Sequence, residues 1–171
     1  MTEAIFAIIA AVAGATATYF IPLIHKSLGS KRRNDLSGEW MSLSFSSEEE
    51  GWLPDRIQLD TTLISIKLKN LDKPCGYEYE GRASVFDDRY LNGEWWSTRA
   101  GATNSGPFSF AIAPQGNYLF GFYGGSERDG AYKWSIWLLG RDEGSLAEAK
   151  KRMLDAAATI SHSGEMLADG G

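Results

Sequence analysis

The positions of hydrophobic residues divide the chain into two parts with different patterns. Residues 4–24 carry no charge and are almost continuously apolar. From Leu36 onward, apolar and polar residues alternate with a period of two, which is typical of β-strands. The pattern therefore predicts an apolar helix followed by a mainly β domain.

The alternating part of the chain predicts eight short strands. Their expected ranges are 38–45, 56–60, 62–69, 76–85, 90–99, 106–112, 117–123 and 132–139. Turn residues lie between them, such as Pro54 with Asp55 and Asp129 with Gly130. Short strands at this spacing favour antiparallel hairpins, and seven or eight of them indicate a barrel or a sandwich.

Several of the later strands are apolar on both faces, so their outer face also needs a cover. In the last predicted strand, Trp134 and Ile136 share one face while Trp137 lies on the other. We expect the cover to be a C-terminal helix, the membrane surface or a partner chain. The helix is predicted at 143–160, with Ser145 and Glu148 as a capping box, and 161–171 as a flexible tail.

The motif Leu-x-Gly-Glu-Trp occurs twice, at 36–40 and at 91–95. The first copy resembles the Gly-x-Trp opening strand of calycin-type barrels, the lipocalin and avidin-like group. In those barrels an arginine near the end of the last strand lies across the tryptophan, and Arg141 occupies that place here. The resemblance implies a cation–π contact between Arg141 and Trp40 that closes one end of the barrel. A role for Arg141 as an anion ligand is the alternative. The second copy of the motif could mark a duplication of half the barrel, but chance explains it at least as well.

The apolar segment 4–24 is long enough to cross a bilayer, because a helix of this length spans roughly 31 Å. A cleavable signal peptide is the alternative, but its usual basic start is replaced by the acidic sequence MTE. Four basic residues between 26 and 33 follow the segment, so the positive-inside rule places the N-terminus outside. We therefore predict a single-pass protein of the inner membrane, with 1–33 as anchor and tether and 34–142 as a cytoplasmic barrel. Small residues along the anchor would let two helices approach closely and form a homo-oligomer, and the alternative is that Ala and Gly are simply common in membrane anchors.

Charge and composition narrow the chemistry. The net charge is −5, and since the first 33 residues contribute +3, the other 138 contribute −8. Such an acidic domain is a poor binder of nucleic-acid polymers, although a small anionic ligand needs only a few local arginines. The single Cys75 cannot form an internal disulfide, and His25 and His162 both lie outside the predicted barrel. The sequence also lacks a Gly-rich phosphate loop and a Ser/His/Asp set, so we predict no catalytic residue, no metal, no cofactor and no enzyme activity.

An apolar membrane segment followed directly by a small eight-stranded barrel resembles the membrane β-barrel effectors of bacterial CBASS anti-phage systems. The likeness rests on segment 4–24 and on GEW at 38–40, YEYEG at 77–81, LNGEWWS at 91–97, YLFG at 118–121 and WLLGR at 137–141. The resemblance implies a barrel that binds a cyclic nucleotide, after which the membrane segments associate and damage the membrane. This chain has one predicted span where that family usually has two, which leaves the killing mechanism open.

The candidate ligand-binding residues are arginines for phosphate and aromatic rings on which a base can stack. Arg99 ends a predicted strand beside the Gly/Ser/Thr-rich segment 100–106, whose backbone N–H groups can also receive an anion. The full candidate set is Arg82, Arg99, Arg128, Tyr79, Trp96 and Tyr118. The alternative for each of them is a core aromatic residue or a solvated arginine.

These observations leave three functions open. The main hypothesis is a membrane-anchored sensor of a small ligand, expected to be a cyclic nucleotide, that signals by self-association. A filled barrel with exposed aromatic residues would instead favour a protein-interaction or assembly module. A hollow and wholly apolar barrel would favour a lipocalin-like binder of an apolar ligand.

Overall fold

The computed structural model describes residues 35–46, 51–62, 64–126 and 132–168, and only the helical backbone for 157–168. Contacts within the chain divide it into Met1–Lys31 and Arg32–Gly171, and the fold below is that of the second unit. The predicted membrane anchor lies outside the described residues. Among the helices of the described part, none combines the length and the apolar character that a membrane span requires.

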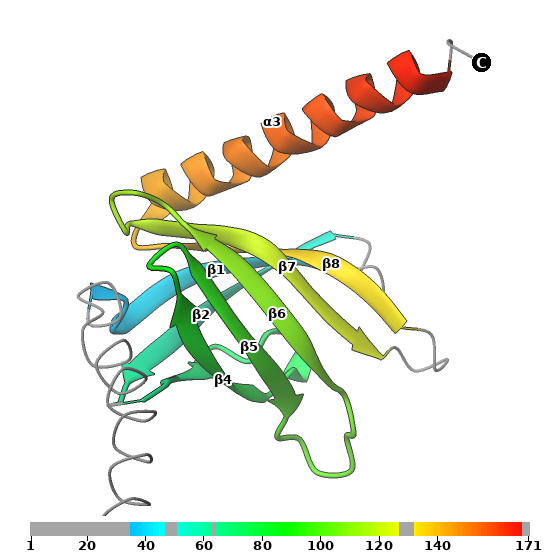
Figure 1. Cartoon of the computed structure of the whole chain (residues 1–171). Helices are drawn as coiled ribbons and strands as arrows, with labels where there is room; N and C mark the ends of the chain where they lie inside the picture. The colour runs from blue at the N-terminus through cyan, green and yellow to red at the C-terminus, as the bar shows by residue number, and fades with distance from the viewer. Residues whose placement is uncertain (1–34, 47–50, 63, 127–131, 169–171) are drawn as a thin grey trace, which may run out of the picture. The chain divides into compact units, whose positions relative to one another are not determined.

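Eight antiparallel strands form a closed barrel in which each strand pairs with its neighbours in sequence and the last returns to the first (Figure 1). The strands are β1 (Gly38–Ser46), β2 (Gly51–Thr61), β3 (Ile66–Asn70), β4 (Tyr79–Phe86), β5 (Tyr90–Ser97), β6 (Ser105–Ile112), β7 (Tyr118–Ser126) and β8 (Tyr132–Gly140). A short 3₁₀ helix, η1 (Pro74–Gly76), connects β3 to β4. The predicted mainly β fold with an eight-stranded antiparallel barrel is confirmed.

The predicted turn at Pro54 and Asp55 is wrong, because both residues lie inside β2. β2 pairs with β1 from Gly51 to Leu59, and Pro54 lies opposite Leu43. The Asp55 side chain is buried and accepts hydrogen bonds inside the fold. The local turn signal of a proline beside an aspartate is therefore overridden by strand pairing.

One half of the barrel interior is a packed apolar core. Its buried side chains include Leu36, Trp40, Ile57, Leu59, Ile66, Leu68, Leu91, Phe108, Phe110, Leu119 and Leu139. Gly93, from the second Leu-x-Gly-Glu-Trp copy, makes room for them: a Cβ there would lie 2.2 Å from the Arg82 carbonyl oxygen and 2.6 Å from Phe108 Cζ. The absence of a side chain on Gly93 thus lets the Phe108 ring fill the barrel.

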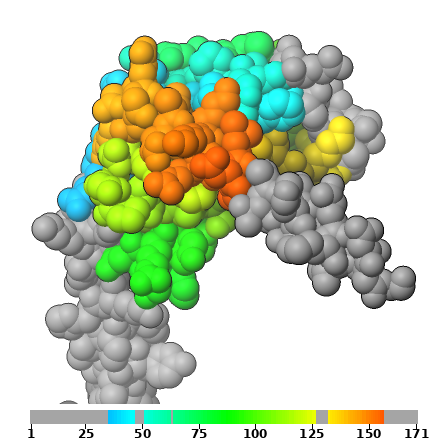
Figure 2. All heavy atoms as spheres, turned by 90° about the horizontal axis from the view of Figure 1, so that it is seen from above, coloured from blue at the N-terminus to red at the C-terminus, as the bar shows by residue number. Residues whose placement is uncertain are grey.

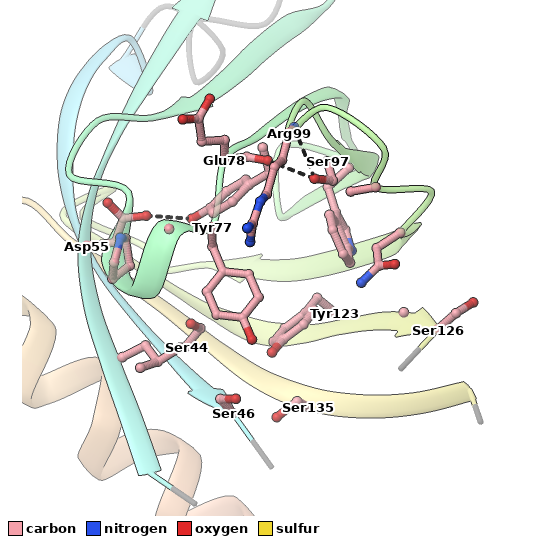
Figure 3. A pocket seen from close by; sticks show the side chains of 18 of the residues that line it. Ser44, Ser46, Asp55, Tyr77, Glu78, Ser97, Arg99, Tyr123, Ser126 and Ser135 are labelled. Atoms are coloured by element: carbon pink, nitrogen blue, oxygen red, sulfur yellow. Dashed lines mark hydrogen bonds between the residues drawn. The ribbon is translucent and has the colours of Figure 1, made fainter. Parts of the chain in front are cut away.

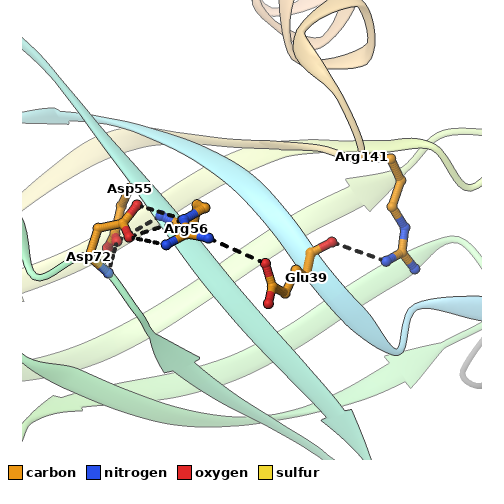
Figure 4. A network of polar contacts seen from close by, with 5 residues as sticks. All are labelled: Glu39, Asp55, Arg56, Asp72 and Arg141. Atoms are coloured by element: carbon orange, nitrogen blue, oxygen red, sulfur yellow. Dashed lines mark hydrogen bonds and ion pairs between the residues drawn. The ribbon is translucent and has the colours of Figure 1, made fainter.

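Arg141 joins the last strand to the first at this packed end. Its guanidinium carbon lies 4.0 Å from the ring centroid of Trp40, a geometry of cation–π contact. The same guanidinium donates hydrogen bonds to the backbone oxygens of Asp35, Ser37 and Glu39, at 2.5, 2.9 and 3.2 Å. Figure 4 shows Arg141 reaching across to Glu39. This is the contact that the calycin resemblance implies. Through it, the Arg141 side chain closes the packed end of the barrel.

Helix α3 (Glu143–Ala168) covers the outer face of β7, β8 and β1 (Figures 1 and 2). Its buried residues Ala149 and Met153 cluster with Tyr118 and Leu138 of the barrel wall. Strands that are apolar on both faces thus have the core inside and α3 outside, which is one of the three expected covers.

α3 begins at Glu143 as predicted, whereas its N-cap residue and its C-terminal end differ from the prediction. The helix starts after Asp142, whose Oδ1 accepts the Ser145 backbone N–H at 2.7 Å, so Asp142 rather than Ser145 is the N-cap. This hydrogen bond lowers the pKa of Asp142. The helix continues to Ala168, into the segment predicted as a tail.

Candidate functional site

The other half of the barrel interior is hollow. It contains a cavity of about 740 Å³, lined by side chains of β1, β2, β4, β5, β7 and β8 and by the segments around η1 and after β5 (Figure 3). Pockets that hold a small organic molecule have volumes of about 300–1,000 Å³. The cavity therefore has the size of a ligand site.

Four aromatic rings separate the cavity from the packed core. Tyr79, Trp95, Tyr123 and Trp137 line the cavity, and each contacts two of the others in sequence around a ring. Their centroids are 5.6–6.4 Å apart and their planes lie nearly perpendicular, which is a favoured edge-to-face geometry. Trp137 also contacts the core ring Phe110, with centroids 5.2 Å apart. We call these four residues the aromatic layer.

The polar atoms of the aromatic layer are tied to the barrel wall. The four hydrogen bonds run from Tyr79 OH to Asp55 Oδ2 (2.9 Å), from Trp95 Nε1 to Gly124 O (2.9 Å), from Tyr123 OH to Phe45 O (3.0 Å) and from Trp137 Nε1 to Ser42 Oγ (2.9 Å). Rings held in this way keep their orientation in the absence of a ligand. The aromatic layer is therefore a preorganised surface for a planar group.

Asp55 is a buried carboxylate at the edge of the cavity. Its Oδ1 accepts the backbone N–H groups of Arg56 and Asp72, at 2.8 and 3.1 Å (Figure 4). Burial raises the pKa of Asp55 and outweighs these hydrogen bonds and that of Tyr79, which lower it. Burial and the adjacent Asp55 carboxylate raise the pKa of Tyr79 well above its usual value, so the phenol stays protonated and remains a donor. On the exposed side, the Arg56 guanidinium pairs with Asp72 at 2.7 Å, which lowers the pKa of that carboxyl group.

Positive charge collects at the mouth of the cavity. Arg99 and Lys133 both line it, and Figure 3 shows the Arg99 side chain extending into the space beside Tyr77 and Tyr123. Within the described ranges, Arg99 forms no ion pair with a carboxylate, whereas Glu78, the acidic residue at the mouth, pairs with Lys73 at 3.0 Å. The Arg99 charge is therefore available to an anionic ligand.

Hydroxyl groups complete the lining. The residues that supply them are Ser44, Ser46, Ser97, Thr103, Ser126 and Ser135. The backbone after β5 also borders the cavity at Ala100, Gly101 and Ala102. Among the residues that the structure describes, no group of three or more His, Cys, Asp or Glu side chains is placed to hold a metal ion. The cavity thus combines basic side chains at its mouth, an aromatic layer, a set of neutral hydroxyls and the two carboxylates of Asp55 and Glu78.

Two of the candidate residues taken from the sequence, Arg99 and Tyr79, line the cavity. Arg128 lies outside the described residues.

Three other candidates, Arg82, Trp96 and Tyr118, do not line this cavity because they lie on the outer face of the barrel. Successive side chains of a strand point to opposite faces, so Trp96 points outward because its neighbour Trp95 points inward. Arg82 is exposed on β4, and Tyr118 is buried beneath α3.

The sequence reasoning missed most of the aromatic layer. Trp95, Tyr123 and Trp137 were not among the candidates, yet strand periodicity carries a signal for Trp95 and Trp137. Trp95 is four residues after the core residue Leu91 on β5, and Trp137 is two residues before the core residue Leu139 on β8. Positions two or four apart on a strand share a face, so counting from the core would have selected both.

Comparisons with known proteins support the barrel and assign no family. No family model matches the chain, and no curated protein matches it. Among solved structures, the chain is similar to EF1p2_mFAP2b bound to DFHBI, with a TM-score of 0.54 and 12% identity over 66% of this chain and 98% of that chain. It is also similar to the redesigned β-barrel b11L5F_LGL, with a TM-score of 0.49 and 12% identity over 66% of this chain and 96% of that chain. A third similar structure is the redesigned β-barrel mFAP1 bound to DFHBI, with a TM-score of 0.47 and 15% identity over 64% of this chain and 98% of that chain. At this identity, the first likeness shows a shared fold alone.

Proposed function

We propose that the open half of the barrel binds one small anionic molecule that carries an aromatic ring. The observation that carries this proposal is Arg99, which forms no ion pair with a described carboxylate and lies at the mouth of a cavity of about 740 Å³ whose floor is the aromatic layer. A guanidinium forms strong charge-assisted hydrogen bonds to phosphate or carboxylate groups, and aromatic side chains stack on planar rings. The similar barrel EF1p2_mFAP2b, solved with DFHBI bound, supports the idea that a barrel of this kind can hold such a molecule.

The ligand class in our proposal is a cyclic nucleotide. Its phosphates would accept hydrogen bonds from the Arg99 guanidinium, and its bases would stack on the aromatic layer. The second half of the proposal comes from the resemblance to CBASS effectors. In it, the anchor predicted at 4–24 holds the barrel at the cytoplasmic face of the inner membrane. Ligand binding then causes the membrane helices to associate. The proposed role is binding and signalling, with no catalytic step.

The lining of the cavity argues against a carrier of apolar ligands. Such a ligand would have to displace water from Asp55, Arg99 and the serine hydroxyls without replacing its hydrogen bonds. Burying polar groups in this way is costly. A binder of apolar molecules would be expected to present a wholly apolar wall, as the packed half of this barrel does.

The test is calorimetric titration of the full-length chain in detergent micelles with cyclic di-GMP, cyclic di-AMP and cyclic tri-AMP. We expect binding heat with at least one probe and a roughly tenfold or greater loss of affinity in Arg99→Ala, from removal of a charge-assisted contact. Arg82→Ala is the matched control, because it removes an arginine from the exposed outer face of β4. Absence of heat with every probe would contradict the nucleotide proposal, and an equal loss in both variants would show that the cavity is not the site.

A second candidate function is a protein-interaction module, favoured by an aromatic patch on the outer face of β7 and β8. Phe122, Tyr132 and Trp134 are 48%, 50% and 60% exposed, and the rings of Tyr132 and Trp134 are in edge contact at 5.9 Å. Exposed aromatic residues in a cluster often mark association surfaces. If the patch drives self-association, Trp134→Ser should lower the sedimentation mass of the full-length protein, whereas Phe86→Ser, at an equally exposed position elsewhere, should not.

A further inference from the structure

The seam between β1 and β8 closes the barrel, and its backbone pairing is short. β1 and β8 pair over four residues, from Met41 with Gly140 to Ser44 with Trp137. By contrast, β7 and β8 pair over nine. Both β1 and β8 continue past the last pair, toward the mouth of the cavity. The wall beyond Ser44 and Trp137 therefore needs another source of cohesion.

Two side-chain hydroxyls supply that cohesion. The Ser135 hydroxyl donates to the backbone oxygen of Phe45 at 2.6 Å, and the Tyr123 hydroxyl donates to the same oxygen at 3.0 Å. A carbonyl oxygen has two lone pairs, so these two donors satisfy it. The mouth end of the seam is thus held by hydrogen bonds from side chains in place of a backbone ladder.

Both of these hydroxyls also face the cavity. Ser135 and Tyr123 line it together with Arg99, and Figure 3 shows them on the wall that borders the same open space. Each hydroxyl has a single hydrogen, so it cannot donate to a ligand and to Phe45 at the same time. Hydrogen bonds to a charged acceptor are about twice as strong as those to a neutral one. An anionic oxygen that reaches these hydroxyls therefore competes directly with the Phe45 carbonyl.

We propose that an anionic ligand takes the hydroxyl hydrogens of Tyr123 and Ser135 from Phe45 and thereby opens the mouth end of the β1–β8 seam. This inference rests on the proposed function, because it requires a ligand in the cavity. The opened seam lies next to α3, since Ile136 of β8, just beyond the last pair, packs in the same cluster as Ala149 and Met153 of the helix. Ligand binding inside the barrel is in this way transmitted to the packing of α3 outside it.

The test is hydrogen–deuterium exchange of the full-length chain with and without cyclic di-GMP or cyclic di-AMP. We expect slower exchange at 97–104, where the ligand covers the mouth, and about fivefold faster exchange at 44–46 and 133–137, where the seam opens. Guanosine and adenosine are matched probes without phosphate and should leave the seam unchanged. Slower exchange at the mouth with an unchanged or slower seam would overturn the inference and leave ligand binding intact. No change in any segment, together with no calorimetric heat, would overturn the proposed function and the inference with it.

A double variant tests the same mechanism without a ligand. In Tyr123→Phe with Ser135→Ala, both donors to Phe45 are removed, so the seam should exchange faster in the free protein and show no further increase with a cyclic dinucleotide. The control is Ser109→Ala, which removes a hydroxyl that donates to Asn92 Oδ1 at 2.7 Å on the outer face. Wild-type exchange at the seam of the double variant would show that the hydroxyls do not hold it.

Discussion

β1 contributes Trp40 to the packed half of the barrel and Ser44 to the hollow half, and β8 likewise contributes Leu139 and Ser135. Both halves are thus built from the same strands and the same register. An eight-stranded barrel is just wide enough for large side chains to fill. Where the inward residues are large and apolar, the interior is solid, and where several are serine, a cavity remains. Side-chain size along each strand therefore decides which half stabilises the fold and which half is available for a ligand.

The two halves also differ in how their polar groups are used. At the packed end the Arg141 guanidinium is directed at backbone carbonyls and the Trp40 ring, and burial lowers its pKa. At the open end the Arg99 guanidinium forms no ion pair with any carboxylate in the described part of the chain. An arginine whose guanidinium contacts the fold itself serves stability, while one that forms no ion pair with the described carboxylates can serve binding.

The largest expected effect is in the packed core. Phe110→Ala should lower the free energy of unfolding by about 3–5 kcal/mol, because a fully buried ring is replaced by a void. Tyr123→Phe, at the open end, should cost only about 0.5–1.5 kcal/mol for one hydrogen bond. Urea unfolding followed by tryptophan fluorescence measures both values, and equal losses would break the distinction between the two halves.

Removal of the seal at the packed end should have the next largest effect. Arg141→Ala removes the contact with Trp40 and three hydrogen bonds to β1 and the residues before it, so we expect a loss of about 2–3 kcal/mol. Arg141→Lys should recover only part of this, because one ammonium group keeps the charge but lacks the planar fork. Thermal unfolding of the three proteins distinguishes these outcomes, and full recovery by lysine would show that charge alone closes the barrel.

Asp55 should give the open end a pH dependence of stability. Burial raises its pKa in the folded state above the unfolded value of 3.8, so the folded protein binds more protons between these two values. The free energy of unfolding should therefore fall as pH rises from about 3.8 through the raised pKa. Above the raised pKa, Asp55 should cause no further change in the free energy of unfolding. Asp55→Asn removes this titration, so the difference in stability between it and the wild type should change with pH only in that window. A constant difference across the window would contradict the assignment.

The smallest effect on stability is expected at Arg99. Arg99→Ala should change the free energy of unfolding by no more than about 0.5 kcal/mol, because the exposed side chain forms no ion pair with the described carboxylates. Urea unfolding in the absence of nucleotide is the measurement. A larger loss would place Arg99 among the structural residues and weaken its assignment to binding.

Periodicity predicted the number of strands well and their faces less well. The ranges for β5 to β8 differ from the structure by at most three residues at either end. Trp96 was predicted as a ligand residue, but its neighbour Trp95 is the one that faces the cavity. A shift of one position along a strand moves a side chain to the opposite face of the sheet. The turn predicted at Pro54 shows the reverse case, in which a local signal is weaker than pairing with a neighbouring strand.

The amino-acid sequence by itself determined the class of the fold, because alternation of apolar and polar residues encodes strands and their turns locally. It also determined that Trp40 and Arg141 stand at the start of the first strand and the end of the last, where closure of the barrel brings them together. Only the tertiary structure decided which aromatic residues surround a cavity and that Asp55 is buried against Tyr79. These facts depend on which side chains from distant strands meet inside the barrel and on whether their combined volume fills it.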